Sequence, residues 1–201
     1  TDSLGRVFLA IAHNKFKYSH APPADPPTEA LHASRTVFDI EGHSREIMDA
    51  KGRIVMRYDY DLLGGLIHQT SMEAGDRWML NDATGNAFYA WDSRGRQFRI
   101  AYDALRRPTD SLLRENSAAE RTVGRTIYGE TLPDPEIHNL RGQVVQSFDQ
   151  AGIVTNDAFD FKTNLLASRR RLAREYKATP DWSNPVPLEA DSYASRTRYD
   201  A

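Results

Sequence analysis

The sequence contains no cysteine among its 201 residues. This absence excludes a disulfide-stapled scaffold, catalysis by a thiol and the usual metal-thiolate sites. An excess of one charge is also missing, since the net charge is −2 and the isoelectric point is near 6.3. A chain without a basic excess lacks the electrostatic footprint of nucleic-acid binding. No apolar run approaches the roughly 20 residues of a membrane-spanning helix, and residues 4–11 are too short and interrupted for a signal peptide.

Sequence motifs of catalysis are equally absent. There is no Gly-x-Ser-x-Gly motif and no phosphate-binding loop. The six histidines are scattered, and no pair has the spacing on a helix that a zinc site favours. We interpret His43 and His68 as partly exposed histidines of a sheet. A hydrolase would need clustered acids or a histidine dyad, so we expect no enzyme activity, no cofactor and no metal site.

What the sequence does contain is a repeated motif, Asp-x-x-Gly. It occurs seven times, whereas independent placement of 18 Asp and 12 Gly would give about one copy. Five copies lie in residues 38–103, and the first aspartates of successive copies are 10, 12, 21 and 10 residues apart. Aspartate favours the first position of a type I turn, and glycine supplies the left-handed conformation that ends it. The predicted turn residues are Asp39 and Gly42, Asp49 and Gly52, Asp61 and Gly64, Asp82 and Gly85, Asp92 and Gly95, and Asp149 and Gly152.

Regularly spaced carboxylates could instead bind calcium. Calcium loops, however, gather several oxygen ligands within about a dozen residues. Each motif here offers one aspartate with apolar or basic neighbours, so the turn interpretation is preferred. Arginine follows the glycine in several copies, as in Arg53 and Arg96. We expect these arginines to lie over neighbouring tyrosine rings or to pair with aspartates one repeat away.

The residues between the motifs alternate in polarity. In residues 53–60, for example, Ile54, Met56 and Tyr58 share one face. Period-two alternation between turns about ten residues apart predicts successive antiparallel hairpins. The predicted fold class is therefore all-β, an antiparallel meander of hairpins that forms a curved sheet. An aromatic residue often precedes the motif aspartate. The side chains predicted to pack the wall of this sheet are Tyr58, Tyr60, Trp91, Phe98 and Tyr102.

The combined pattern is Tyr-Asp-x-x-Gly-Arg about every 20 residues, with a second Asp-x-x-Gly at the half period. It resembles the YD repeat of RHS proteins, which include bacterial polymorphic toxins, the B/C component of insecticidal toxin complexes and the animal teneurins. The resemblance covers residues 2–6 and 35–108 well, residues 139–166 moderately, and residues 199–201 as a beginning.

This resemblance implies an arc of a larger hollow β-shell that encloses a C-terminal toxic effector. It implies as partners the remainder of the repeat shell, the enclosed toxin polypeptide and proteins of a delivery complex. It also implies a bacterial protein that is secreted or at the cell surface. The Asp-Pro-x-Gly-type motif by which such toxins release their cargo is missing. Asp134 and Pro135 stand in a different context, so self-cleavage is not assigned to this chain.

We expect residues 1–201 to be a single fragment of a repeat array, an excerpt of a longer protein, because neither end shows a capping repeat. Residues 165–177 fit either a helix or a strand. The four arginines at 169–174 are interpreted as a solvated face, with an anion-binding patch as the alternative. The predicted segments are a partial repeat at 1–19, a proline-rich loop at 20–30, regular repeats at 31–113 and degenerate repeats with long loops at 114–201. Within them we predict strands at 6–12, 31–38 and 121–128 and a loop at 180–187. In the turn at 160–164, Thr163 stands where glycine is expected, and Asn164 could take the left-handed position instead.

The alternative function is an extracellular module for adhesion that binds glycans or proteins. Aromatic side chains exposed on a repetitive sheet could stack on sugar rings. Trp78, Trp91 and Trp182 would then be clustered and partly exposed. The wall of a shell would instead bury them and spread them apart.

Overall fold

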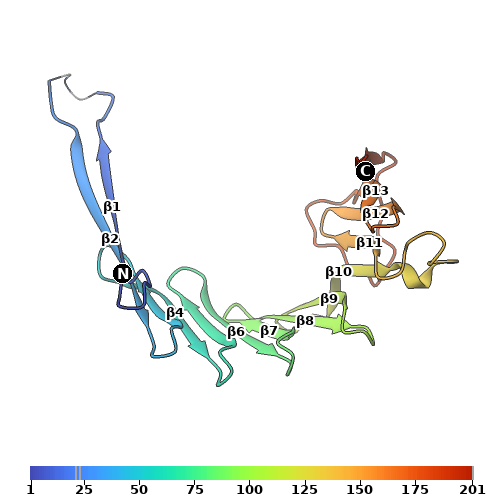
Figure 1. Cartoon of the computed structure of the whole chain (residues 1–201), viewed down its shortest axis with the longest axis horizontal. Coiled ribbons are helices and arrows are strands. Elements are labelled where there is room, and N and C mark those ends of the chain that lie inside the picture. Colours follow the sequence, from blue (N-terminus) through green and yellow to red (C-terminus); the bar gives the residue numbers. More distant parts are fainter. Residues whose placement is uncertain (21, 23, 201) are drawn as a thin grey trace. The chain divides into compact units, whose positions relative to one another are not determined.

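The computed structural model describes residues 1–20, 22 and 24–200. Within them, strands β1 to β14 hydrogen-bond in chain order, and neighbouring strands pair in an antiparallel manner (Figure 1). The predicted all-β antiparallel meander is confirmed. No helix of the described residues has the length and apolar character to cross a membrane. The elements are β1 (Leu9–Phe16), β2 (Thr28–Phe38), β3 (Ser44–Met48), β4 (Ile54–Tyr60), β5 (Leu66–Ser71), β6 (Gly75–Asn81), β7 (Ala87–Asp92), β8 (Arg96–Tyr102), β9 (Pro108–Glu115), β10 (Arg121–Tyr128), the 3-10 turn η1 (Gly129–Thr131), β11 (Val144–Asp149), β12 (Gly152–Phe159), β13 (Leu165–Leu172) and β14 (Tyr193–Arg196).

The chain divides into two compact units, and β7 contributes residues to both. Unit 1 comprises residues 1–86 and 91–94, and unit 2 comprises residues 87–90 and 95–201. Unit 1 is a sheet in which no described side chain is fully buried. Unit 2 holds the apolar core of the described chain, which consists of Leu113, Leu140, Val145, Ala173 and Trp182.

In unit 1, β1 and β2 form a long hairpin, drawn in blue in Figure 1. β2 begins at Thr28, three residues before the strand predicted from residue 31, so the predicted loop at 20–30 is too long. The extension is stabilised across the hairpin, where Glu29 contacts the ammonium group of Lys15 at 2.7 Å. Pro23, one of the prolines of the predicted loop, lies outside the described residues.

The edges of this hairpin are only partly covered. β3 pairs with β2 from Arg35 onwards, and the preceding part of β2 hydrogen-bonds to β1. The first strand starts at Leu9 and continues to Phe16, whereas the sequence predicted it at residues 6–12. Its apolar side chains on both faces are exposed, Ile11 by 59%. Backbone pairing rather than burial of side chains therefore defines β1.

Five of the seven Asp-x-x-Gly motifs show one turn geometry, described here for Asp49. The amide of Asp49 donates to the Arg53 carbonyl at 2.9 Å, and the amide of Gly52 donates to the Asp49 carbonyl at 3.0 Å. The Asp49 carboxylate oxygen Oδ1 accepts the amides of Lys51 and Arg53 at 2.9 and 3.0 Å. Gly52 has φ of +75°, a conformation that L side chains rarely adopt. The same arrangement recurs at Asp2, Asp39, Asp61, Asp82, Asp103 and Asp160.

In two turns a residue other than glycine takes the left-handed position. These residues are Arg106, with φ of 61°, and Thr163, with φ of 67°. The prediction that Asn164 would replace the glycine is wrong. The amide of Asn164 donates to Asp160 Oδ1 at 2.8 Å, and its carbonyl accepts the Asp160 amide at 3.0 Å. These bonds fix Asn164 as the first residue of the returning chain, so Thr163 must turn.

In unit 2, residues 173–192 return over the sheet and complete the core. The indole Nε1 of Trp182 donates to the Asp149 carbonyl at 3.1 Å, and its ring packs edge-on against Phe148 at 5.1 Å. The residues before this segment, which fit either a helix or a strand in the sequence, form strand β13 at 165–172, and this strand pairs with β12 and β14. The sequence predicted a loop at 180–187 but not its role in packing.

Candidate functional site

The predicted turn residues lie at the connections between successive strands. The six glycines of this set have positive φ angles, from +75° at Gly52 to +142° at Gly152. Gly152 differs from the others because a Cβ atom there would collide with the backbone of Arg171 and Leu172 on β13. Each Asp and Gly pair shapes its own connection, and the set does not converge on one site.

The arginine that follows the motif pairs with the aspartate of its own turn. Arg53 contacts Asp49 at 2.6 Å, and Arg107 contacts Asp103 at 2.8 Å. The expected pairing one repeat away is therefore wrong for these arginines, because the turn already brings residues four apart together. The Arg53 guanidinium, by donating to the Asp49 carboxylate, holds the pKa of that carboxyl below its usual range.

The expected stacking of motif arginines on aromatic rings is found at two positions. The guanidinium carbon of Arg107 lies 3.9 Å from the centre of the Tyr128 ring, and that of Arg6 lies 5.0 Å from the Phe38 ring. Both contacts join one repeat to another part of the sheet. Arg107 also contacts Glu130 at 2.8 Å, so this side chain links three separate positions.

Two of the predicted wall residues hold neighbouring strands together through their hydroxyls. Tyr60 donates to the Ser44 carbonyl at 3.1 Å, and Tyr102 donates to the Ala87 carbonyl at 2.6 Å. In both cases the tyrosine precedes a turn aspartate, and its partner lies at the start of another strand. The aromatic residue of the repeat therefore adds a polar contact that hydropathy alone did not predict.

The other predicted wall residues differ in exposure. Tyr58 is half-buried, whereas Trp91 and Phe98 are 36% and 37% exposed. Their packing role as a wall stays a prediction. The tryptophans divide between the two interpretations made from the sequence. Trp78 and Trp91 lie together, as expected of a binding module, and Trp182 is buried, as expected of a wall.

A row of aromatic rings crosses unit 1. The His68 ring stacks on Trp78 with centres 5.0 Å apart, and Trp78 stacks on Trp91 with centres 6.0 Å apart. At the end of the row His68 Nδ1 lies 2.9 Å from Asp59 Oδ2, and Asp59 also contacts Arg45 at 3.0 Å. From the sequence, His68 was interpreted as a partly exposed histidine of a sheet, without these contacts. The register between strands places these residues side by side: Asp59 pairs with His68, and His68 pairs with Trp78. A prediction of this register would have brought the three side chains together.

One cluster in the described chain has the side chains of a metal site. Ligand atoms of Asp39, Glu41 and His43 lie within 4.8 Å of one another. His43 Nδ1 is 3.5 Å from each carboxylate, which is long for a hydrogen bond. Asp39 Oδ1 already accepts the amides of Glu41 and His43. Three groups held by one turn do not complete a coordination sphere, and the turn geometry alone explains their proximity.

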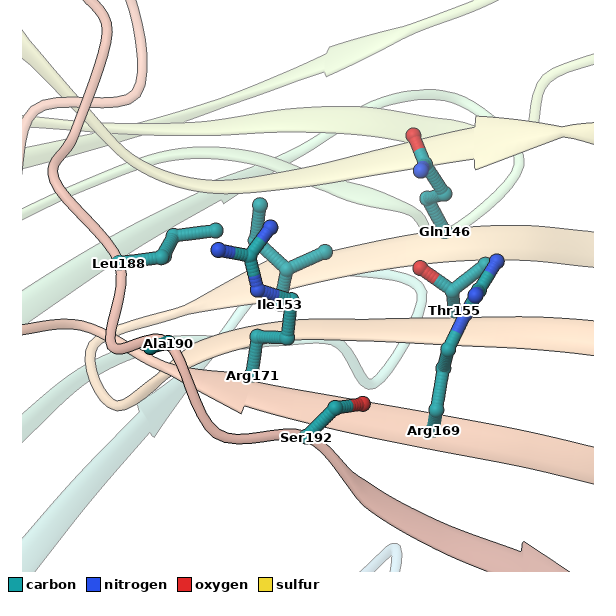
Figure 2. Close-up of a pocket in the computed structure, with 8 residues that line it drawn as sticks. All are labelled: Gln146, Ile153, Thr155, Arg169, Arg171, Leu188, Ala190 and Ser192. Atoms are coloured by element: carbon teal, nitrogen blue, oxygen red, sulfur yellow. The ribbon is translucent and has the colours of Figure 1, made fainter.

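A hollow of about 410 Å³ lies on one face of β11, β12 and β13 in unit 2 (Figure 2). Arg169 and Arg171 project into it from alternate positions of β13. Arg170 lies between them and pairs instead with Asp149 at 2.6 Å. The predicted solvated face of arginines is thus divided between two sides of the strand. The lining residues are Gln146, Ile153, Thr155, Arg169, Arg171, Leu188, Ala190 and Ser192.

Comparison with known proteins identifies relatives of this repeat sheet. The chain matches no family model. It is 27% identical over 192 residues to the toxin subunit YenC2 of Yersinia entomophaga, a match that covers 82% of this chain and 20% of the relative. The chain thus spans about a fifth of the length of that relative.

Solved structures show the same fold. A crystal structure of TcdB2-TccC3 matches 98% of this chain with a TM-score of 0.75 and 21% identity, over 10% of its own chain. A Tc holotoxin pore of Photorhabdus luminescens with a mutation in TccC3 matches 89% of this chain with a TM-score of 0.73 and 21% identity, over 9% of its own chain. The resemblance predicted from the repeats is confirmed, and the chain is similar in sequence and in fold to the RHS-type components of Tc toxins.

Proposed function

We propose that this chain is a wall segment of a hollow shell that encloses a C-terminal toxic effector, without catalysis of its own. The observation that supports this most directly is the construction of unit 1. It is one layer of seven paired strand segments without a buried side chain among the described residues. A sheet layer that forms no core of its own is suited to a wall whose faces meet other material. The turn residues Asp39/Gly42 to Asp149/Gly152 set the course of that wall.

The proposal includes the partners and location of the chain. The remainder of the same repeat shell would continue the wall, and the enclosed polypeptide would contact its inner face. Proteins of a toxin complex would deliver the assembly, and the chain would act outside the producing cell. The names of the relatives, which are toxin subunits and Tc complexes, support this part of the proposal.

Limited proteolysis of the complete protein tests enclosure. In the unmodified protein, the C-terminal polypeptide should resist a protease while exposed loops are cut. Gly152→Val should open the wall at β12 and β13, because its side chain has no room beside Arg171, and cleavage of the C-terminal polypeptide should accelerate. Lys51→Ala, on an exposed turn, is the matched control. Cleavage of that polypeptide in the unmodified protein as fast as in Gly152→Val and as fast as at the exposed loops would contradict enclosure.

A binding module remains the second candidate because of the tryptophan pair. Trp78 and Trp91 stack in unit 1, and Trp91 is 36% exposed. Aromatic rings at such positions offer surface for sugar rings or for an aromatic partner. A glycan array probed with the chain and with Trp91→Ala decides this function. Binding that is lost in the variant would support it, and the absence of any bound glycan would refute glycan recognition.

A further inference from the structure

We propose that the hollow over β13, defined by the eight lining residues above, is a binding site for an extended acidic peptide segment. The proposal commits to carboxylate side chains at alternate positions of the peptide, followed by a large apolar residue. It concerns unit 2 alone and does not depend on the wall function.

The hollow exists because the returning chain is longer than the strand it faces. Leu188 pairs with Ala173, and Tyr193 pairs with Arg170. Between these pairs, two residues of β13 face four residues of the returning chain. The Glu189 amide still donates to the Leu172 carbonyl at 2.9 Å. The extra length bows residues 190–192 away from β13, and Figure 2 shows Ala190 and Ser192 beside the arginines. The site is therefore built by backbone register.

The charge of the hollow favours an anion. Its lining contains two guanidinium groups and no carboxylate. Arg171 uses one nitrogen, Nη2, to donate to the Glu189 carbonyl at 3.1 Å. Arg169 contacts Asp157 at 2.9 Å and remains 56% exposed. Since each guanidinium carries five donors in a planar fork, both side chains retain donors suited to a carboxylate.

The spacing of the arginines favours an extended peptide. Arg169 and Arg171 are two residues apart on one face of a strand, which separates their Cα atoms by about 7 Å. Carboxylates at alternate positions of an extended peptide have the same spacing. Arg169, but not Arg171, also lines a second hollow of about 270 Å³. Apolar side chains of the second hollow are Ile127, Leu132, Leu140 and Val145. A peptide with Glu, Glu and Leu at successive alternate positions therefore complements the arginines and the apolar hollow in order.

Fluorescence anisotropy with a labelled peptide tests the site on the whole chain. The probe is Gly-Glu-Ser-Glu-Ser-Leu-Gly, acetylated and amidated at its ends, and its counterpart has Gln in place of both Glu. We expect the first to bind and the second to bind at least about tenfold more weakly, since charge-assisted hydrogen bonds are lost. Equal binding of the two peptides would overturn the proposal.

Variants locate the binding on the chain. Arg169→Gln and Arg171→Gln should each weaken binding by about tenfold. Arg174→Gln removes the same charge from an exposed residue outside the hollow and should leave binding unchanged. Equal loss in all three variants would show an effect of net charge and refute the site.

Two further measurements cover a folding defect and a different ligand. Asp157→Asn releases Arg169 from its ion pair and should tighten binding, an effect that loss of structure would not produce. Succinate offers two carboxylates without an apolar group. If succinate competes with the peptide at equal concentration, the site recognises small anions and the assignment to a peptide is wrong.

Discussion

Replacement of Thr163 by glycine should stabilise the protein. Thr163 is exposed and has φ of 67°, a position where a β-branched side chain is strained. A residue in the left-handed helical region costs about 1–2 kcal/mol. Glycine removes that cost but adds about 0.4–1 kcal/mol of conformational entropy to the unfolded chain. The hydrogen bond of the Thr163 amide to the Asp160 carbonyl at 3.0 Å is retained. The net gain is about 0.8 kcal/mol at the middle of these ranges, which together span about 0 to 1.6 kcal/mol.

Urea unfolding followed by circular dichroism measures this gain. For Thr163→Gly the transition midpoint should rise while its slope stays constant, because the surface exposed on unfolding is unchanged. The control is Lys162→Gly at the preceding exposed position, where φ is not positive. Lys162→Gly should lower the midpoint because it adds entropy to the unfolded chain and removes the contact of the ammonium group with the Phe161 ring at 5.5 Å. A lower midpoint for Thr163→Gly as well would refute the argument that the turn strains Thr163.

Three further predictions concern other parts of the chain. Gly152→Ala should destabilise unit 2 by about 2 kcal/mol or more, because the new methyl group overpacks against the β13 backbone; thermal unfolding that matches the unmodified protein would contradict this contact. Trp182→Ala should cost about 3–5 kcal/mol, and Trp182→Phe less, since Phe keeps one buried aromatic ring while it loses the second ring of the indole and the Nε1 hydrogen bond; calorimetry should rank the two variants in that order. The pKa of Asp82 is lowered to about 2, and the largest cause is the hydrogen bond from the Thr84 hydroxyl. The ionised carboxylate therefore stabilises the folded state above its ordinary pKa, and this stabilisation is lost as pH falls from about 4 to 2. Unfolding of Asp82→Asn should depend less on pH in that window, and an unchanged dependence would show that Asp82 does not contribute.

The repeats predicted the strands and turns because both depend on nearby residues. Asp49 and Gly52 form their turn with bonds that span at most four residues. Alternation along the chain then placed most strands, and β10 at Arg121–Tyr128 matches the predicted range. Local patterns were ambiguous where the secondary structure depends on the neighbouring strands. β13 is such a case, since it forms a strand because it pairs with β12 and β14.

The sequence offered the arginines of β13 as an anion-binding patch, but the hollow that two of them line could not be predicted from the same patterns. The hollow at Arg169 and Arg171 arises from a mismatch of register between β13 and residues 188–193, and register is a property of two segments. The core position of Trp182 likewise depends on contacts with Asp149 and Phe148, far away in sequence. At β1 the local pattern predicted the strand correctly, but its apolar side chains are exposed. Apolar residues in a strand therefore do not by themselves show that the strand is buried.

The order in which strands pair has a consequence for synthesis of the chain. Since each strand hydrogen-bonds to its sequence neighbours, a hairpin can form as soon as its second strand has left the ribosome. The bond from the Thr122 amide to Asp181 is different, because its partners are 59 residues apart. At about 5–20 residues per second, β10 waits roughly 3–12 s for this partner. During that interval the apolar face that Trp182 will cover is open to solvent. Misassembly of the nascent chain is therefore most favoured while unit 2 is incomplete.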